Sequence, residues 1–136
     1  MSQLIGSRLS FAGVQVKCTP CDRSANLAAA ARLIQKKPGY DFYLLPELSC
    51  PGYDTEAFTQ REELAEDAEH GPSRLFFAPL ARKMKAFIAY GIMRRCTGGA
   101  ITIAHVVLDD AGSVVAVYDK MHLCNLGVCS EGGQGM

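Results

Sequence analysis

In the stretch "DFYLLPELSCPGYD", residues 41–54, an apolar run ends at Pro46 and is followed at once by an acid, Glu47. Residues 40–45, which include the apolar run 42–45, are predicted to form a buried strand of an α/β protein. Pro51 and Gly52 predict a turn shortly after it. A charge is costly to bury, so an acid at the end of a buried strand needs a reason. Glu47 is therefore a candidate functional residue, because strand-to-loop junctions commonly carry the chemistry of α/β proteins.

The segments on either side alternate between strand and helix patterns. Residues 8–16 are expected to form a strand, and residues 22–37 a helix that begins after Asp22 as its N-cap. Residues 72–85 are expected to form a second helix, in which Pro79 predicts a kink or an early end. The remaining strands are expected at 40–45, 86–92, 100–109 and 113–120, with a hairpin turn at 109–112. The order β-α-β-α-β-β-β indicates an α/β architecture in which helices cover a sheet.

The composition is that of an ordinary globular chain. Of the 136 residues, 49% are hydrophobic and 21% are charged, and this length suits one domain or part of one. Lys+Arg and Asp+Glu number 14 each, so no charge excess favours nucleic acid or a membrane surface as a partner. No stretch approaches the roughly 20 apolar residues that cross a bilayer. The first ten residues resemble a transit peptide only faintly, and a cytoplasmic location is expected.

An acid-rich segment follows the candidate residue Glu47. Residues 54–71 are polar, and five acids lie within 61–70. A solvated helical face or loop is the favoured interpretation, and an acidic binding surface is the alternative.

The six cysteines are expected to be reduced, because the chain shows no secretory signal and can form an apolar core. Cys18 and Cys21 form a C-x-x-C pair between a strand and a helix, an arrangement typical of thiol redox proteins. As half of a zinc site they would need a second pair of ligands. Cys124 and Cys129 are spaced too far apart for the usual structural pair, so no metal site is predicted.

Two motifs together resemble the nitrilase superfamily of carbon–nitrogen hydrolases. They are "LLPELSCPGY", which contains Glu47, and "VYDKMHLCNLG", which contains Lys120. The resemblance extends through most of the chain. It also includes "FAGVQV", "CDRSANLAAAARLI", "GIMRR" and "VVLDDAGSVVAVYDKMHL".

The resemblance implies an α-β-β-α sandwich, of which this chain would be an incomplete part. It also implies a Cys-Glu-Lys triad, in which Glu47 is the general base and Lys120 stabilises the oxyanion. Tyr118, His122 and Glu131 are possible supporting residues. No metal or organic cofactor is implied, and the expected partners are a small amide, carbamoyl or nitrile substrate and, in a homo-oligomer, further copies of the protein.

The nucleophile that the resemblance implies has no match in this chain. Cys50, Cys124 and Cys129 lack the expected position and sequence context, so the nucleophilic Cys is expected beyond residue 136. Residues 1–136 are then the N-terminal part of a carbon–nitrogen hydrolase domain, inactive alone and with apolar sheet surface exposed. Two alternatives stay open: a non-catalytic product that associates with a full-length relative, and a small thiol redox protein that uses Cys18 and Cys21.

Overall fold

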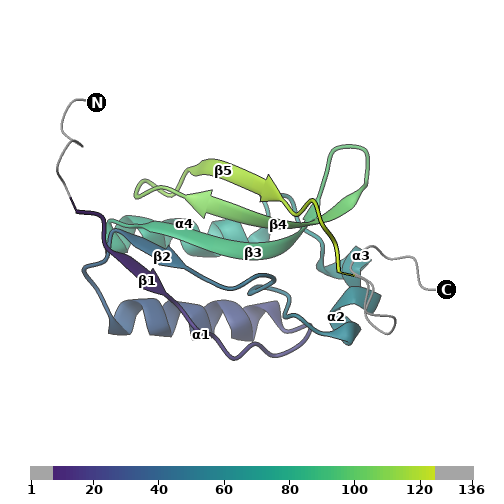
Figure 1. Cartoon of the computed structure of the whole chain (residues 1–136), viewed down its shortest axis with the longest axis horizontal. Helices are drawn as coiled ribbons and strands as arrows, with labels where there is room; N and C mark the ends of the chain where they lie inside the picture. The colour runs from purple at the N-terminus through teal and green to yellow at the C-terminus, as the bar shows by residue number, and fades with distance from the viewer. Residues whose placement is uncertain (1–7, 125–136) are drawn as a thin grey trace.

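The computed structural model describes residues 8–124, whose centre is one five-stranded mixed sheet (Figure 1). The strands, which lie side by side in chain order, are β1 (Phe11–Gly13), β2 (Phe42–Leu44), β3 (Phe87–Arg95), β4 (Ile101–Leu108) and β5 (Val114–Asp119). The first three are parallel, and β4 and β5 continue as antiparallel neighbours. The predicted α/β order is confirmed, with two short helices added before the last long helix.

The helices are α1 (Arg23–Lys36), α2 (Thr55–Thr59), α3 (Arg61–Leu64) and α4 (Pro72–Met84). Asp22 caps α1 as predicted, because its carboxylate accepts a hydrogen bond of 2.9 Å from the backbone N–H of Ala25. The expected early end at Pro79 is wrong, since α4 continues to Met84. Pro79 lies on the exposed face of the helix, where the carbonyl that loses its partner can reach water. Within residues 8–124, no helix is long and apolar enough to cross a bilayer.

The strand boundaries follow from pairing. The first strand is shorter than its apolar pattern, because only Phe11–Gly13 has a partner in the equally short β2. The predicted hairpin turn at 109–112 is confirmed: the Gly112 N–H donates to the Asp109 carbonyl at 3.0 Å. The Asp109 carboxylate accepts from the backbone N–H groups of Ala111 and Ser113, which stabilises the turn.

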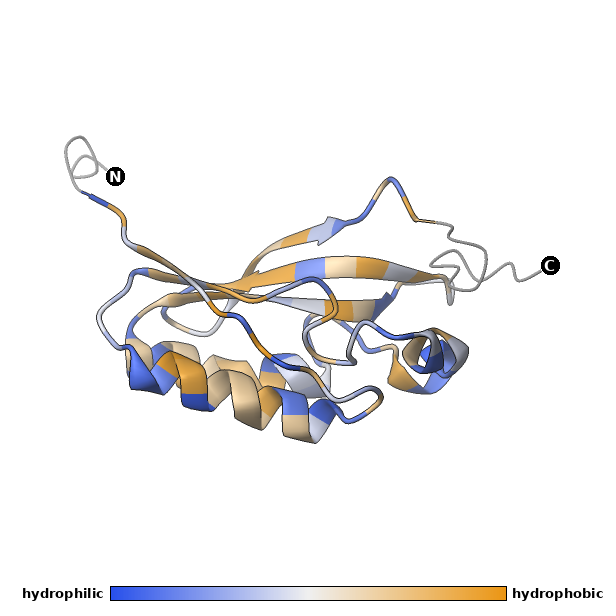
Figure 2. Cartoon of the chain, turned by 60° about the horizontal axis from the view of Figure 1, so that its bottom comes forward, coloured by the Kyte–Doolittle hydropathy of each residue, from blue (hydrophilic) through white to orange (hydrophobic). Residues whose placement is uncertain are grey.

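One face of the sheet is covered by α1 and α4, and the main apolar core lies between them and the strands (Figure 2). Ile34 of α1, Phe77 of α4 and Ile88 of β3 are fully buried there. The ring of Phe77 packs on that of Tyr90 with the centroids 4.9 Å apart. This core holds the helices in place behind the strand ends that carry the candidate site.

The opposite face of the sheet carries exposed apolar side chains. Phe11, Phe42 and Phe87 lie side by side in register on β1, β2 and β3. Their rings are in contact, and Phe11 is 61% exposed. Leu44 continues this surface and is also exposed. The described part of the chain therefore shows the exposed apolar sheet surface that was expected.

The expectation that residues 54–71 are simply solvated is partly wrong. This segment contains α2 and α3, which bury Phe58 and Leu64 in a second apolar cluster. Glu66 is also buried, and its backbone pairs with the end of β3. The segment therefore contributes to the interior beside the strand ends, although most of its acids remain exposed.

Candidate active site

Glu47 and Lys120, the two residues that the sequence motifs select, form an ion pair. The distance between Glu47 Oε1 and Lys120 Nζ is 2.9 Å. Glu47 lies in the turn that follows β2, and Lys120 follows β5 directly. The side chains are 38% and 26% exposed, respectively, so Glu47 is only partly buried although it follows a buried strand segment. A charged pair that is still accessible to solvent can be reached by a small molecule.

The sheet topology explains why two residues so far apart in the sequence meet. The strands β2 and β3 are parallel, and two successive antiparallel steps make β5 run in the same direction as β3. The carboxyl ends of β2 and β5 therefore lie at the same edge of the sheet. A backbone hydrogen bond of 2.8 Å from the Lys120 N–H to the Ile103 carbonyl anchors the residue that follows β5 to β4.

A small cavity of about 90 Å³ opens beside this ion pair. Its lining residues are Glu47, Ile103, Ala104, His105, Tyr118 and Lys120. Tyr118 thus lines the cavity beside the ion pair, while His122 is exposed and is not among these residues. Glu131 falls outside the described residues. Sequence reasoning missed His105, because no local motif marks it and only the register of the sheet places it here.

The turn that carries Glu47 packs directly on β3 at Gly91. A Cβ atom at Gly91 would lie 2.3 Å from the backbone nitrogen of Leu48 and 2.9 Å from the carbonyl carbon of Glu47. Real Cβ atoms do not approach backbone atoms so closely. The absence of a side chain at Gly91 is therefore what lets the turn lie against the strand.

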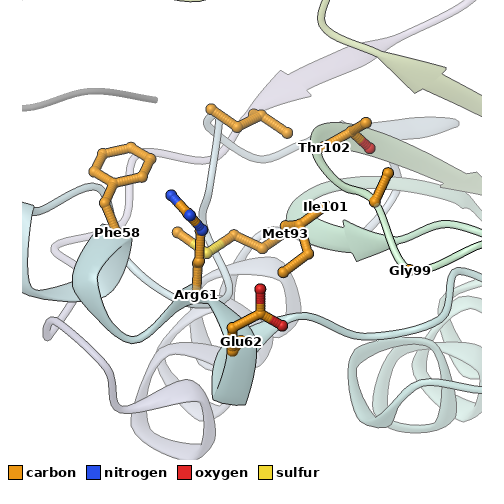
Figure 3. A pocket seen from close by; sticks show the side chains of 9 residues that line it. Phe58, Arg61, Glu62, Met93, Gly99, Ile101 and Thr102 are labelled. Carbon is orange, nitrogen blue, oxygen red and sulfur yellow. The ribbon is translucent and has the colours of Figure 1, made fainter. Parts of the chain in front are cut away.

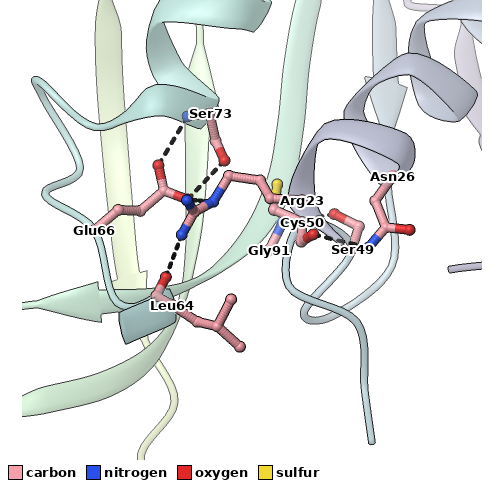
Figure 4. A network of polar contacts seen from close by, with 8 residues as sticks. All are labelled: Arg23, Asn26, Ser49, Cys50, Leu64, Glu66, Ser73 and Gly91. Atoms are coloured by element: carbon pink, nitrogen blue, oxygen red, sulfur yellow. Dashed lines mark hydrogen bonds and ion pairs between the residues drawn. The ribbon is translucent and has the colours of Figure 1, made fainter. Parts of the chain in front are cut away.

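Hydrogen bonds hold this turn from both sides (Figure 4). The Gly91 N–H donates to Ser49 Oγ at 3.1 Å, and the Cys50 N–H donates to the Gly91 carbonyl at 3.1 Å. From α1, the buried amide of Asn26 donates to the Cys50 carbonyl at 2.9 Å. The same amide accepts from the backbone of Thr19. Strand, helix and preceding loop thus share the positioning of Glu47.

The buried carboxylate of Glu66 forms an ion pair with the partly buried Arg23 behind this turn (Figure 4). Arg23 Nε is 3.1 Å from Glu66 Oε1, and the Glu66 carboxylate also accepts from the hydroxyl and the N–H of Ser73. Burial raises the pKa of Glu66, against the opposing effect of Ser73 and Arg23. Burial also raises the pKa of the Cys50 thiol, to about 12. This cluster ties α1 to α4, and its buried thiol is a poor nucleophile.

A larger pocket of about 260 Å³ is drawn in Figure 3. Ile103 lines both this pocket and the small cavity beside the Glu47–Lys120 pair. Its walls come from Phe58 of α2, from α3, and from the ends of β3 and β4. Arg61 and Glu62 project into it from α3. Glu62 forms an ion pair with Arg95 at 3.2 Å. The pocket therefore lies next to the cavity that holds the Glu47–Lys120 pair.

The thiols of the C-x-x-C pair do not have the property that redox chemistry requires. Burial raises the pKa of Cys18. The pKa of Cys21 is raised by desolvation and by the nearby carboxylates of Glu56, Asp54 and Glu63. A reactive redox thiol needs a lowered pKa, so the geometry gives the redox alternative no support. Within residues 8–124, no group of three or more His, Cys, Asp or Glu side chains could hold a metal ion.

Comparison of the sequence with known proteins points to one family. A family model described as carbon-nitrogen hydrolase matches residues 11–134. The omega-amidase NIT3 of Saccharomyces cerevisiae is 24% identical over an alignment of 133 residues, which covers 93% of this chain and 46% of that protein. A protein of Pseudomonas protegens named "hydrolase in pqqF 5'region" is 31% identical over 104 residues, which are 76% of this chain and 36% of that protein.

The fold is also found among solved structures. A crystal structure of Saccharomyces cerevisiae Nit3, described as a member of branch 10 of the nitrilase superfamily, matches with a TM-score of 0.69 and 24% identity. The match covers 85% of this chain and 45% of that chain. An N-terminal amidase matches with a TM-score of 0.78 and 16% identity, over 86% of this chain and 29% of that chain. The chain thus spans less than half the length of these relatives.

Proposed function

Because this chain belongs to the carbon–nitrogen hydrolase family, we propose that it supplies the Glu and Lys of a Cys-Glu-Lys triad that hydrolyses non-peptide carbon–nitrogen bonds. The observation that carries the proposal is the ion pair of 2.9 Å between Glu47 and Lys120 at one edge of the sheet. The nucleophilic Cys lies beyond this chain in the proposal. The activity then belongs to the whole protein of which residues 1–136 form the N-terminal part.

The proposed reaction uses Glu47 as a proton carrier. Its carboxylate takes the proton of the nucleophilic thiol, and the thiolate attacks the amide carbon to form a tetrahedral intermediate. Glu47 then returns the proton to the leaving amine, the carbon–nitrogen bond breaks, and an acyl-enzyme remains. In the second half of the reaction Glu47 takes a proton from water, whose oxygen attacks the acyl carbon. The carbon–sulfur bond then breaks, the acid is released, and Glu47 returns the proton to the sulfur of the nucleophilic Cys.

Lys120 supplies a fixed positive charge during both attacks. Its ammonium group lies at hydrogen-bond distance from Glu47, and so it is next to the position where the oxyanion would develop. A preorganised cation of this kind stabilises the transition state more than the neutral carbonyl of the substrate. The neighbouring pocket of about 260 Å³ supports a small substrate. Amides are the first choice, with carbamoyl amines and nitriles as alternatives.

The test is ammonia release from a panel of small amides and nitriles by the protein as its source cell makes it. We expect Lys120→Met to lower kcat by about 10²–10³-fold and Glu47→Gln by about 10²–10⁴-fold. The matched controls are Lys83→Met and Glu69→Gln, which change exposed charges away from the site. If the two site variants turn over as fast as their controls, the proposed roles are wrong.

Residues 1–136 alone are expected to release no ammonia, and measurable turnover by the pure chain would overturn the placement of the nucleophile beyond it. The exposed apolar face of the sheet supports a second candidate, a non-catalytic product that associates with a full-length relative. An antibody against residues 54–71 and the intact mass of the native protein separate the two. A native species of 14.7 kDa favours the second candidate, and a much heavier one favours the first.

A homo-oligomer and a cytoplasmic location stay predictions for the whole protein. Light scattering on the purified protein tests the first, with a mass equal to one chain as the contradicting result. Cell fractionation tests the second, with recovery in a membrane or organelle fraction as the contradicting result.

A further inference from the structure

We propose that His105 is a positioning residue for Glu47, which it holds through the carbonyl of Leu45, the residue that follows β2. The role rests on the proposed function of Glu47. The observation is a contact of 3.1 Å between His105 Nε2, on β4, and the carbonyl oxygen of Leu45. That carbonyl lies directly before Pro46 and Glu47, at the point where the chain leaves the sheet.

The Leu45 carbonyl needs this donor because the regular one is taken. The Leu45 N–H donates to the Ala89 carbonyl at 2.9 Å, as in an ordinary parallel ladder. In such a ladder the next N–H of β3, that of Gly91, would donate back to the Leu45 carbonyl. Here the Gly91 N–H donates to Ser49 Oγ instead. Ser49 of the turn therefore takes the Gly91 N–H that would otherwise donate to the Leu45 carbonyl. The His105 ring donates to that carbonyl in its place.

The hydrogen bond also determines that Nε2 of the His105 ring carries a proton. A carbonyl oxygen can only accept, so Nε2 of His105 must carry the proton. Leu45 is buried, with 2% of its surface exposed, so its carbonyl has little access to water as a substitute donor. Loss of the ring donor would leave a buried acceptor unsatisfied or draw the Gly91 N–H back from Ser49. Either change moves the turn that carries Glu47.

His105 also lies beside the chemistry itself. Its ring lines the same small cavity as Glu47 and Lys120, and its strand pairs with β5 at Tyr118. If loss of the His105 ring displaces the turn, the geometry of the Glu47–Lys120 pair therefore changes with it. Misplacement of a catalytic group by about 1 Å costs on the order of 10²-fold in rate.

The test compares His105→Phe, which keeps a ring but loses the donor, with His105→Gln, whose amide can still donate. In the protein as its source cell makes it, we expect His105→Phe to lower kcat by about 10–100-fold with little change in KM. His105→Gln should recover most of that loss. His70→Phe is the matched control, since His70 is an exposed surface residue. Equal rates for His105→Phe and the wild type, or for His105→Gln and His105→Phe, would overturn the proposal.

Two NMR measurements do not depend on turnover. In the ¹⁵N-labelled wild type the neutral His105 ring should carry its proton on Nε2, and a ring protonated on Nδ1 alone would refute the hydrogen bond even if a variant fails to fold. The ¹³C resonance of the Glu47 carboxylate should shift in His105→Phe and return in His105→Gln. If this shift occurs while no form hydrolyses amides, the proposed function fails and the positioning role stands.

Discussion

Replacement of Gly91 by alanine is expected to displace the turn that carries Glu47 and to destabilise the chain. The new Cβ would lie 2.3 Å from the Leu48 nitrogen and 2.9 Å from both the Glu47 carbonyl carbon and the Pro46 oxygen. All three are backbone atoms, which cannot rotate away as a side chain can. Overpacking of this kind costs about 1–3 kcal/mol, and here the strand or the turn must move.

Gly13→Ala is the matched control, because a Cβ at that strand residue meets no atom within 4 Å. There the alanine should be neutral or stabilise by about 0.4–1 kcal/mol, through the lower entropy of the unfolded chain. Urea unfolding followed by circular dichroism should therefore separate the two variants by about 1–4 kcal/mol. A difference below about 0.5 kcal/mol would refute the claim that the turn depends on close contact with Gly91.

Three further predictions concern the elements around this turn. Asp22→Ala should lower the free energy of unfolding by about 1 kcal/mol, measured by urea unfolding, because α1 loses the side-chain acceptor of its N-cap; an unchanged midpoint contradicts this. Glu66→Ala should cost about 3–5 kcal/mol, because it strips Arg23 of its buried partner, while Glu69→Ala, at an exposed acid, should stay within about 0.5 kcal/mol. The raised pKa of Cys50, about 12, keeps it a thiol in the fold, so iodoacetamide at pH 8 should spare it until urea unfolds the chain. Fast labelling of native Cys50 would show that the thiol is not buried. The sign for stability follows from the same shift: unfolding should become easier as pH rises from about 9 toward 12, where only the unfolded chain is a thiolate.

The parts of the fold that the sequence predicted correctly are those with strong local signals. The alternation of strand and helix patterns gave the observed order, and Asp22 and the turn at 109–112 behave as their residue types predict. The Glu47 and Lys120 motifs were found through resemblance, and sheet topology brings them together. Pro79 misled, because a proline on the exposed face of α4 is tolerated.

What the sequence did not reveal depends on partners far along the chain. Glu66 lies in an acid-rich segment that composition marks as solvated, but Arg23 of α1 pairs with it in the interior. No motif marks His105, because its partner is the carbonyl of Leu45, just after β2. That carbonyl lacks its regular donor, since the Gly91 N–H donates to Ser49 instead. No pattern within a window of ten or fifteen residues records such contacts.

The most direct test of the central claim, that Glu47 and Lys120 act as one catalytic pair, is a double-mutant cycle on kcat for amide hydrolysis. It uses the protein as its source cell makes it, with Glu47→Gln, Lys120→Met and the double variant. Residues that act as a unit show strongly non-additive losses, so the double variant should be about as slow as the slower single variant. Losses that multiply, or single variants that keep the wild-type kcat, would contradict the account.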